Sequence, residues 1–237
     1  MSGKVLYWRG CMSRLRTKNI ADSTEELLRR LRIDYETLDD EGCCGSVLLR
    51  TGQVEDARTV AKRTADQIKS KGYREVVTSC PGCFRTMSNE YHVLVGDMPF
   101  RIRHISQFLY DHSEELKKHL RPMKLNVVYH DPCHLGRHMG VYEEPRELIK
   151  LVPGVKLVEF KYNRGKSICC GSGGGVHSVF PEIALEVAET VLDDRPEGVD
   201  IVITSCPFCN YNFKEAGGSK VEVIDLPEFL LRAWRAS

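Results

Sequence analysis

The sequence predicts an α/β protein made of two tandem, similar domains with parallel sheets, and three observations lead to this prediction. The chain has 237 residues, which is enough for one large domain or two small ones with a real hydrophobic core. Short apolar runs typical of buried strands alternate with longer segments of helical periodicity. The cysteines and their flanking residues recur at a nearly constant offset, which indicates an internal duplication. We therefore expect one domain in residues 1–121 and a second, related domain in residues 122–237.

Strands and helices alternate along the first half. Val5–Trp8 has the composition of a short buried strand. Two longer segments carry apolar side chains at spacings of three and four residues, and Gly72 provides a stop for the second of them. The expected strands of this half are 5–8, 35–38 and 75–78, and the expected helices are 18–31 and 53–71.

The second half repeats this order after a connecting segment, 84–120, which contains an amphipathic helix at 105–120. Arg121–Pro122 marks the boundary. Strands that alternate with helices imply parallel sheets, so each half is expected to be a Rossmann-like domain with its cysteines just past strand ends. The expected strands of the second half are 125–129, 155–160, 200–204 and 221–224, and the expected helices are 144–151 and 181–192.

The overall composition excludes two classes of partner. Lys and Arg number 34 against 33 Asp and Glu, so no strong field favours nucleic acid or an anionic membrane. No apolar stretch approaches the roughly 20 residues of a membrane-spanning helix. The apolar run Val5–Trp8 meets Arg9 too early for a signal peptide. We expect a cytoplasmic protein without a membrane span, with peripheral docking on a membrane complex left open.

Only the cysteine count is unusual, and the ten cysteines form two matched sets of five. In a reducing compartment such cysteines are metal ligands or redox groups rather than structural disulfides. Each set has one cysteine, an adjacent pair after 31 or 35 residues, and a Cys-Pro-x-Cys closure after 35 more. The offset between sets is 126 residues for the last four cysteines and 122 for the first. The sets are Cys11, Cys43, Cys44, Cys80 and Cys83, and Cys133, Cys169, Cys170, Cys206 and Cys209.

Simpler interpretations of the cysteines each leave some of them unexplained. A structural zinc site takes four ligands and would leave one cysteine over in each half. Disulfides fail on the same odd number, and a bridge between neighbours Cys43 and Cys44 would be strained. The run of cysteines that holds a ferredoxin cluster is absent, and a thioredoxin-like site would use two cysteines per half. Iron–sulfur binding is favoured, and zinc in one half is the alternative.

These residues resemble the tandem cysteine-rich CCG domain of heterodisulfide reductase catalytic subunits and their relatives. The motif is a first cysteine, then Cys43-Cys44-Gly45-Ser46, then Cys80-Pro81-Gly82-Cys83, and it returns in the second half. Both copies keep all five cysteines, which resembles the heterodisulfide reductase type most. The resemblance implies one noncubane four-iron, four-sulfur cluster in each half, held by the five cysteines of that half. Glycines beside the cysteines, among them Gly45, Gly171 and 173–175, would let the backbone approach the clusters.

The activity implied by the resemblance is reduction of the coenzyme M–coenzyme B heterodisulfide to two thiols, with one electron from each cluster. The alternative is an iron–sulfur electron-transfer subunit of a lactate, glycerol-3-phosphate, succinate or thiol:fumarate complex. The sulfonate and phosphate of the heterodisulfide need cations, although solvated surface charge explains each candidate equally well. The candidates are Arg9, Arg14 and Arg16 beside Cys11, and His134 and Arg137 beside Cys133. His130 and His134 are also candidate donors to cluster sulfur.

Electrons have to come from other subunits, because the sequence has no flavin fingerprint and no second type of cluster motif. The expected partners are a ferredoxin-like iron–sulfur subunit and a flavin or cytochrome subunit, besides the small-molecule disulfide. The apolar run at 226–234 is expected either to contribute to such an interface or to close its domain as a helix.

Overall fold

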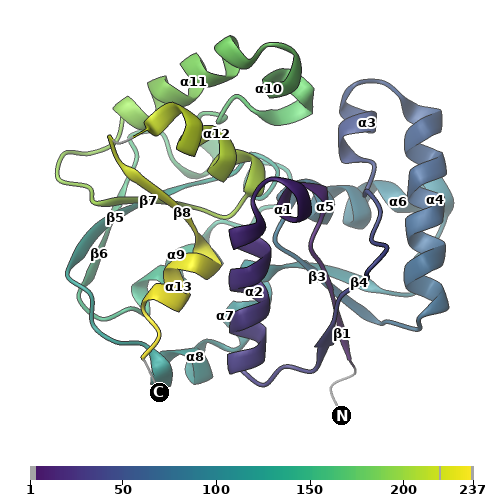
Figure 1. Cartoon of the computed structure of the whole chain (residues 1–237), viewed down its shortest axis with the longest axis horizontal. Coiled ribbons are helices and arrows are strands. Elements are labelled where there is room, and N and C mark those ends of the chain that lie inside the picture. Colours follow the sequence, from purple (N-terminus) through teal and green to yellow (C-terminus); the bar gives the residue numbers. More distant parts are fainter. Residues whose placement is uncertain (1–3, 219, 236–237) are drawn as a thin grey trace. The chain divides into compact units, whose positions relative to one another are not determined.

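The computed structural model describes residues 4–218 and 220–235, and its contacts divide the chain into two compact units, Met1–Ile105 and Ser106–Ser237. Each unit contains a four-stranded sheet whose paired strands are all parallel. The strand order is β2-β1-β3-β4 in the first unit and β6-β5-β7-β8 in the second, so the two sheets share one topology. The predicted fold class, two similar α/β domains with parallel sheets, is confirmed (Figure 1).

In the first unit the central strand β1 is buried along its whole length. It pairs with β3 from Val5 opposite Glu75 to Trp8 opposite Thr78. Helices α2 and α4 lie on opposite sides of the strands (Figure 1), which explains why β1 is apolar throughout rather than alternating. The strands are β1 (Val5–Trp8), β2 (Tyr35–Glu36), β3 (Glu75–Thr78) and β4 (Arg101–His104). The helices are α1 (Cys11–Leu15), α2 (Lys18–Arg30), α3 (Ser46–Arg50), α4 (Val54–Ser70), α5 (Pro81–Arg85) and α6 (Tyr91–Val95), with a π-helical turn at Thr86–Glu90.

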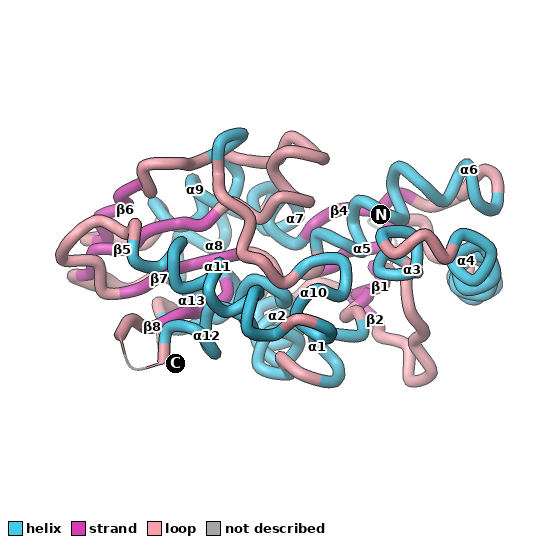
Figure 2. The backbone as a smooth tube through the Cα atoms, turned by 90° about the horizontal axis from the view of Figure 1, so that it is seen from above, coloured by secondary structure: helices cyan, strands magenta, loops and turns pink. Residues whose placement is uncertain are grey.

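In the second unit β5 and β7 are the central strands, and β5 pairs with both β6 and β7. Figure 2 shows these strands running side by side, and in Figure 1 α11 and α12 lie together on one side of them. The strands are β5 (Leu125–His130), β6 (Val155–Glu159), β7 (Ile201–Thr204) and β8 (Glu222–Asp225). The helices are α7 (Ile105–Asp111), α8 (Ser113–His119), α9 (Glu143–Lys150), α10 (Val176–Val179), α11 (Pro181–Asp193), α12 (Pro207–Gly217) and α13 (Leu226–Arg232).

Two segments differ from the sequence-based expectation, and a third matches one of the two alternatives given for it. The connecting segment 84–120 contains β4, an edge strand that was not predicted because Arg101, Arg103 and His104 make it read as polar. The single helix expected at 105–120 is two helices, α7 and α8, separated at His112, whose ring Nδ1 donates a hydrogen bond to the Phe108 carbonyl (2.8 Å). The run at 226–234 is the closing helix of its unit, with Leu226, Phe229 and Leu230 buried.

The contact-based division falls at the start of α7, whereas the boundary expected from the sequence lies at residues 121 and 122. The intervening segment contacts the C-terminal part of the second unit: the Arg121 amide donates to the Ala233 carbonyl (2.8 Å), and the His119 ring stacks on Trp234. Within the described part of the chain, no helix combines the length and the apolar character needed to cross a membrane.

Candidate metal centres

The cysteines of each unit lie on loops and helix starts at the carboxyl edge of the sheet. Cys11 follows β1 and opens α1, and Cys80 follows β3 and caps α5. The two strands are neighbours, and their connections leave in opposite directions, which is where open α/β sheets place their ligands. In the second unit Cys133 and Cys206 follow β5 and β7 in the same way. The topology therefore brings cysteines that are distant in sequence to one edge.

In the first unit the five thiols form a continuous chain of hydrogen-bonded neighbours. Cys11 and Cys44 interact with Cys43, and Cys83 interacts with both Cys44 and Cys80. Cys44, Cys80 and Cys83 are buried, whereas Cys11 and Cys43 are partly exposed. All ten cysteines of the chain are free thiols, so no disulfide competes for them.

The second unit repeats this arrangement thiol for thiol. Cys133 and Cys170 interact with Cys169, and Cys209 interacts with both Cys170 and Cys206. The partly exposed members are again the first cysteine and the first of the adjacent pair. The three buried thiols belong to an apolar core cluster that also contains Val128, Phe160 and Phe213. One side of each thiol group is thus sealed by the core, and the other is open.

The thiol groups are electrostatically coupled. Hydrogen bonds from Cys11 and Cys44 lower the pKa of Cys43 to about 2, and those from Cys133 and Cys170 lower the pKa of Cys169 to about 2. The pKa of a donating thiol shifts in the opposite direction. The hydrogen bond to Cys43, and then burial, raise the pKa of Cys11. In each group these hydrogen bonds favour the thiolate form of one cysteine, and metal ions that bind cysteines displace thiol protons.

Two glycines show how closely the backbone approaches the thiols. Gly10 has φ +80°, and a Cβ there would lie 3.2 Å from the Cys83 Sγ. Gly171, directly after the second adjacent pair, has φ +89°, and a Cβ there would lie 2.8 Å from the Ala184 carbonyl on α11. Both positions require glycine. The run Gly173–Gly175, expected to continue the wrap, is a 3₁₀ turn in which Gly173 and Gly174 are exposed.

Polar side chains that the sequence analysis missed anchor the carbonyls of the adjacent pairs. The Tyr91 hydroxyl donates to the Cys44 carbonyl (3.1 Å), and Asn212 Nδ2 donates to the Cys170 carbonyl (2.6 Å). Tyr91 and Asn212 lie at different positions in the two repeats, so the same carbonyl is fixed by different residues. No motif in the sequence signals this role, because the side chain and its carbonyl are more than 40 residues apart in each case.

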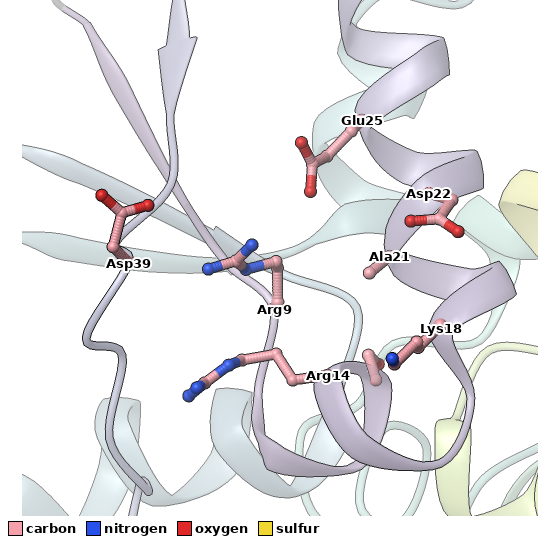
Figure 3. Close-up of a pocket in the computed structure, with 8 residues that line it drawn as sticks. Arg9, Arg14, Lys18, Ala21, Asp22, Glu25 and Asp39 are labelled. Atoms are coloured by element: carbon pink, nitrogen blue, oxygen red, sulfur yellow. The ribbon is translucent and has the colours of Figure 1, made fainter.

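Glu41 organises the loop of Cys11. Its buried carboxylate accepts hydrogen bonds from the backbone amides of Arg9 (3.0 Å) and Gly10 (2.6 Å). Burial raises the pKa of Glu41, and those two amides, with the Arg9 and Arg14 side chains, act in the opposite direction. The Arg9 guanidinium also donates to the Leu38 carbonyl (2.5 Å). Arg14 donates to the Glu41 carbonyl, so two of the three predicted arginines, Arg9 and Arg14, support this loop and also line the cavity in Figure 3, whereas Arg16 is not among the residues that line it.

The Cys133 loop has a different support, a buried ion network. Both oxygens of Asp131 accept from Arg146 (2.7 and 2.8 Å), and Arg146 also donates to both oxygens of Glu159 (2.8 Å each). The side chains of Asp131 and Arg146 are 2% and 1% exposed. Asp131 also accepts from the Arg164 amide (2.7 Å), which ties the segment leading to Cys169 to the Cys133 loop.

Two of the remaining predicted residues of the second half, Arg137 and His130, contact the same segment. Arg137 donates to the Ser167 carbonyl, and the His130 Nε2 donates to the Ile168 carbonyl (3.1 Å). Burial lowers the pKa of His130, which favours the neutral ring, and in the neutral ring with Nε2 as the donor the Nδ1 is an acceptor. This tautomer has no second N–H for a cluster sulfur. The rings of His134 and His138 meet edge to face at 5.3 Å.

The donor chemistry of these groups fits an iron–sulfur centre. Across residues 4–218 and 220–235, no three or more His, Cys, Asp or Glu side chains form a ligand group for one metal ion. What the fold assembles instead is two extended groups of five thiols, and cysteine thiolate is the ligand that iron–sulfur clusters use. A tetrahedral zinc site would take four of them. The residues fit a polynuclear group better than single zinc ions.

A duplicated parallel α/β fold with five thiols at the carboxyl edge of each sheet defines the class of this protein as a tandem thiol-rich binding domain. The family model of the cysteine-rich CCG domain matches residues 5–88 and 127–214. The chain therefore belongs to the CCG cysteine-rich domain family, with two copies of the domain, as its motifs predict.

The relatives it resembles are redox proteins. A chain of the dihydromethanophenazine:CoB–CoM heterodisulfide reductase of Methanosarcina acetivorans is 38% identical over 96% of this chain and 57% of that protein. A chain of the fumarate reductase (CoM/CoB) of Methanothermobacter marburgensis is 34% identical over 98% of this chain and 46% of that protein. The chain thus spans about half the length of the curated relatives it matches.

More distant similarities add little about function. The EtfAB:quinone oxidoreductase of Syntrophomonas wolfei is 27% identical over 87% of this chain and 30% of that protein. A solved structure, the aspartate racemase of Picrophilus torridus, is 14% identical with a TM-score of 0.46, over 99% of this chain and 96% of that one. No functional conclusion follows from a structural likeness at this level.

Proposed function

We propose that each unit holds one noncubane four-iron, four-sulfur cluster through all five of its cysteines. The support is the donor set itself, because five thiols converge in each unit in the same order and none is left over. The open side of each group, at Cys11 and Cys43 or at Cys133 and Cys169, is where a ligand can reach the centre. The proposed ligands are Cys11, Cys43, Cys44, Cys80 and Cys83 in the first unit, and Cys133, Cys169, Cys170, Cys206 and Cys209 in the second.

The function that this pair of sites supports best is reduction of a disulfide to two thiols, in a heterodisulfide reductase-type complex. The observation that carries the proposal is the presence of two complete, matching thiol groups in one chain. When bound, the clusters supply the two electrons that cleavage of an S–S bond consumes, and two protons complete the thiol products. Because relatives are named for the CoB–CoM heterodisulfide, that compound is the first substrate to test.

The chain's own residues bind and orient the centres in this proposal. The cysteine thiols lose their protons on binding, and the amide of Gly45 donates to the Cys43 Sγ (3.4 Å), which stabilises that thiolate. Glu41 in one unit and the network of Asp131, Arg146 and Glu159 in the other hold the cysteine loops. Electrons would come from partner subunits, for which we propose a ferredoxin-like iron–sulfur subunit and a flavin or cytochrome subunit.

The proposal is tested on anaerobically purified protein. We expect about eight irons per chain from two such clusters, and turnover of the coenzyme M–coenzyme B disulfide with a reduced dye as the electron donor. About four irons together with one zinc would contradict the two-cluster assignment. A full iron complement without turnover of any disulfide would contradict the catalytic assignment alone.

The second candidate is an iron–sulfur electron-transfer subunit of a dehydrogenase complex. The similarity to the EtfAB:quinone oxidoreductase favours it, because that name describes electron transfer to a quinone. In this case both centres would be reduced and reoxidised by protein partners, and no small disulfide would change the rate of reoxidation. Stopped-flow reoxidation of the dye-reduced chain, with and without the heterodisulfide, separates the two functions.

A further inference from the structure

The first unit has a polar cavity of about 330 Å³ beside the Cys11 loop (Figure 3). This volume lies at the lower end of the range for small-molecule sites. Helix α1, which begins at Cys11, contributes two of the lining residues, and the start of α2 contributes four. The cavity is lined by Arg9, Ser13, Arg14, Lys18, Ala21, Asp22, Glu25 and Asp39.

Charges of both signs face this cavity without neutralising one another. Figure 3 shows Arg9 between Asp39 on one side and Glu25 on the other, with Arg14 below. Among the described residues, no ion pair joins a cation of the cavity to one of its three carboxylates, Asp22, Glu25 and Asp39. Within the described residues, the three carboxylates and the cations Arg14 and Lys18 have no ion-pair partner, whereas Arg9 pairs with the buried Glu41 (3.6 Å) and faces the cavity as one end of that pair. A wholly anionic or wholly cationic ligand would leave half of these charged groups facing like charge.

Part of the cavity's hydrogen-bonding capacity is also unused. Arg9 and Arg14 each donate to a backbone carbonyl, which fixes the guanidinium groups but leaves other N–H donors of each free. Ser13 is 1% exposed, and its hydroxyl has no partner in the part of the chain that the structure describes. A buried hydroxyl without a partner is costly unless a ligand or water completes it. The cavity thus offers donors near its floor and carboxylates at its rim.

We propose that this cavity binds the α-amino-acid group of a small molecule, with its carboxylate at Arg9, Arg14 and Ser13 and its ammonium at the rim carboxylates. An α-amino acid places both charges on one carbon, which matches a small cavity lined by both signs. The identity of the ligand rests on the proposed function: if the chain reduces a disulfide, the ligand is the amino-acid half of that disulfide. A wholly anionic heterodisulfide would then be a poorer ligand of this chain.

The test uses thioether probes, which carry no thiol to bind iron and no S–S bond to be reduced. Calorimetric titration of the anaerobic, iron-loaded chain with S-methyl-L-cysteine should give saturable binding. The analogue without the ammonium, 3-(methylthio)propanoate, and the analogue without the carboxylate, 2-(methylthio)ethylamine, should each bind at least tenfold more weakly. The wholly anionic 2-(methylthio)ethanesulfonate should also bind at least tenfold more weakly.

The double variant Asp22→Asn with Asp39→Asn removes the charge of two rim carboxylates, which are exposed and have no ion-pair partner within the described residues. This variant should weaken S-methyl-L-cysteine at least tenfold, and the matched charge change Asp66→Asn with Asp97→Asn, also at exposed positions, should leave it unchanged. Equal affinity for all four probes, no binding of S-methyl-L-cysteine, or an equal effect of both variants overturns the proposal. The titration measures binding without turnover. If the chain binds S-methyl-L-cysteine but reduces no disulfide, the proposed function is contradicted and the proposed binding site is not.

Discussion

Single buried side chains hold the cysteine loops, and the two units use different ones. In the first unit the Glu41 carboxylate holds two backbone amides just before Cys11. In the second unit Asp131 occupies the chain just before Cys133 and pairs with Arg146, which is itself almost fully buried. A buried ion pair contributes little net stability when intact, but removing one partner leaves an uncompensated charge inside the protein. The support of each loop is therefore sensitive to substitution of a single residue.

Arg146→Met should lower the free energy of unfolding by about 3 to 5 kcal/mol, because it strands the buried carboxylate of Asp131. It should also reduce the iron bound by the second unit, since Arg146 would no longer hold the Asp131 carboxylate that accepts from the Arg164 amide and joins that segment to the Cys133 loop. Chemical denaturation and iron analysis measure the two effects. The control Arg232→Met breaks an exposed pair with Glu222 and should cost at most about 1 kcal/mol. Equal losses of unfolding free energy and of iron in both variants would contradict a supporting role of the buried network.

The cysteines could be predicted from the sequence, and their supporting residues could not. The number, repetition and spacing of the ten cysteines predict that they form two sites, and the fold places each set at one edge of a sheet. Glu41 and Arg146 look like ordinary surface charges in the sequence, since their partners lie 31 and 15 residues away and meet them only in the folded state. The prediction of Arg9, Arg14 and Arg137 rests only on their proximity to a cysteine in the sequence, and in the structure all three donate to backbone carbonyls.

At the level of elements, each adjacent cysteine pair is followed by a glycine that packs against a helix. Gly45 lies against α4 and Gly171 against α11, both with positive φ. The left-handed conformation lets the chain turn after the pair, so that both thiols stay beside the other cysteines. The contact is tighter at Gly171, where a Cβ would lie 2.8 Å from the Ala184 carbonyl oxygen, than at Gly45, where the nearest atom, the Ala57 carbonyl oxygen, would lie at 3.4 Å.

Gly171→Ala should therefore disrupt the second centre. The left-handed backbone alone costs roughly 1–2 kcal/mol for a non-glycine residue, and here the new Cβ would also meet the Ala184 carbonyl at 2.8 Å. The control Gly198→Ala has φ +71° with nothing within 4 Å, so it should show the conformational cost alone. Thermal unfolding and iron content measure the difference. Equal behaviour of the two variants would mean that α11 moves aside at no cost.

The strands and long helices were predicted well because their patterns are strong and local. The start and end of Val5–Trp8 and of Glu75–Thr78 agree with the expectation, and α2, α4 and α11 agree within about two residues at each end. Strand β4 was missed because its two arginines and His104 hide a strand in which Ile102, Arg103 and His104 are buried by tertiary packing. Helices α5 and α12 are not among the expected helices, because the closing cysteine motif that begins each of them is expected only just past a strand end.

At the scale of the whole molecule, the duplication has preserved both the topology and the order of thiol contacts. The two sheets have the same strand order, and the hydrogen-bonded chain of thiols runs through equivalent cysteines in both units. The residues around the thiols have diverged, as Tyr91 and Asn212 illustrate. Because each unit contains a complete set of five donors, each should bind its cluster without the other.

Cys44→Ser and Cys170→Ser test this independence as a matched pair. Both residues are fully buried members of the adjacent pair, and each contacts two other thiols of its own unit. A serine hydroxyl is a poor substitute for thiolate as an iron ligand, so each variant should lose about half of the iron. Electron paramagnetic resonance of the reduced protein should then show the signal of the remaining centre alone, different in the two variants. Loss of all iron from either variant would show that the centres assemble as one unit, and unchanged iron in both would contradict the assignment of five cysteines to each cluster.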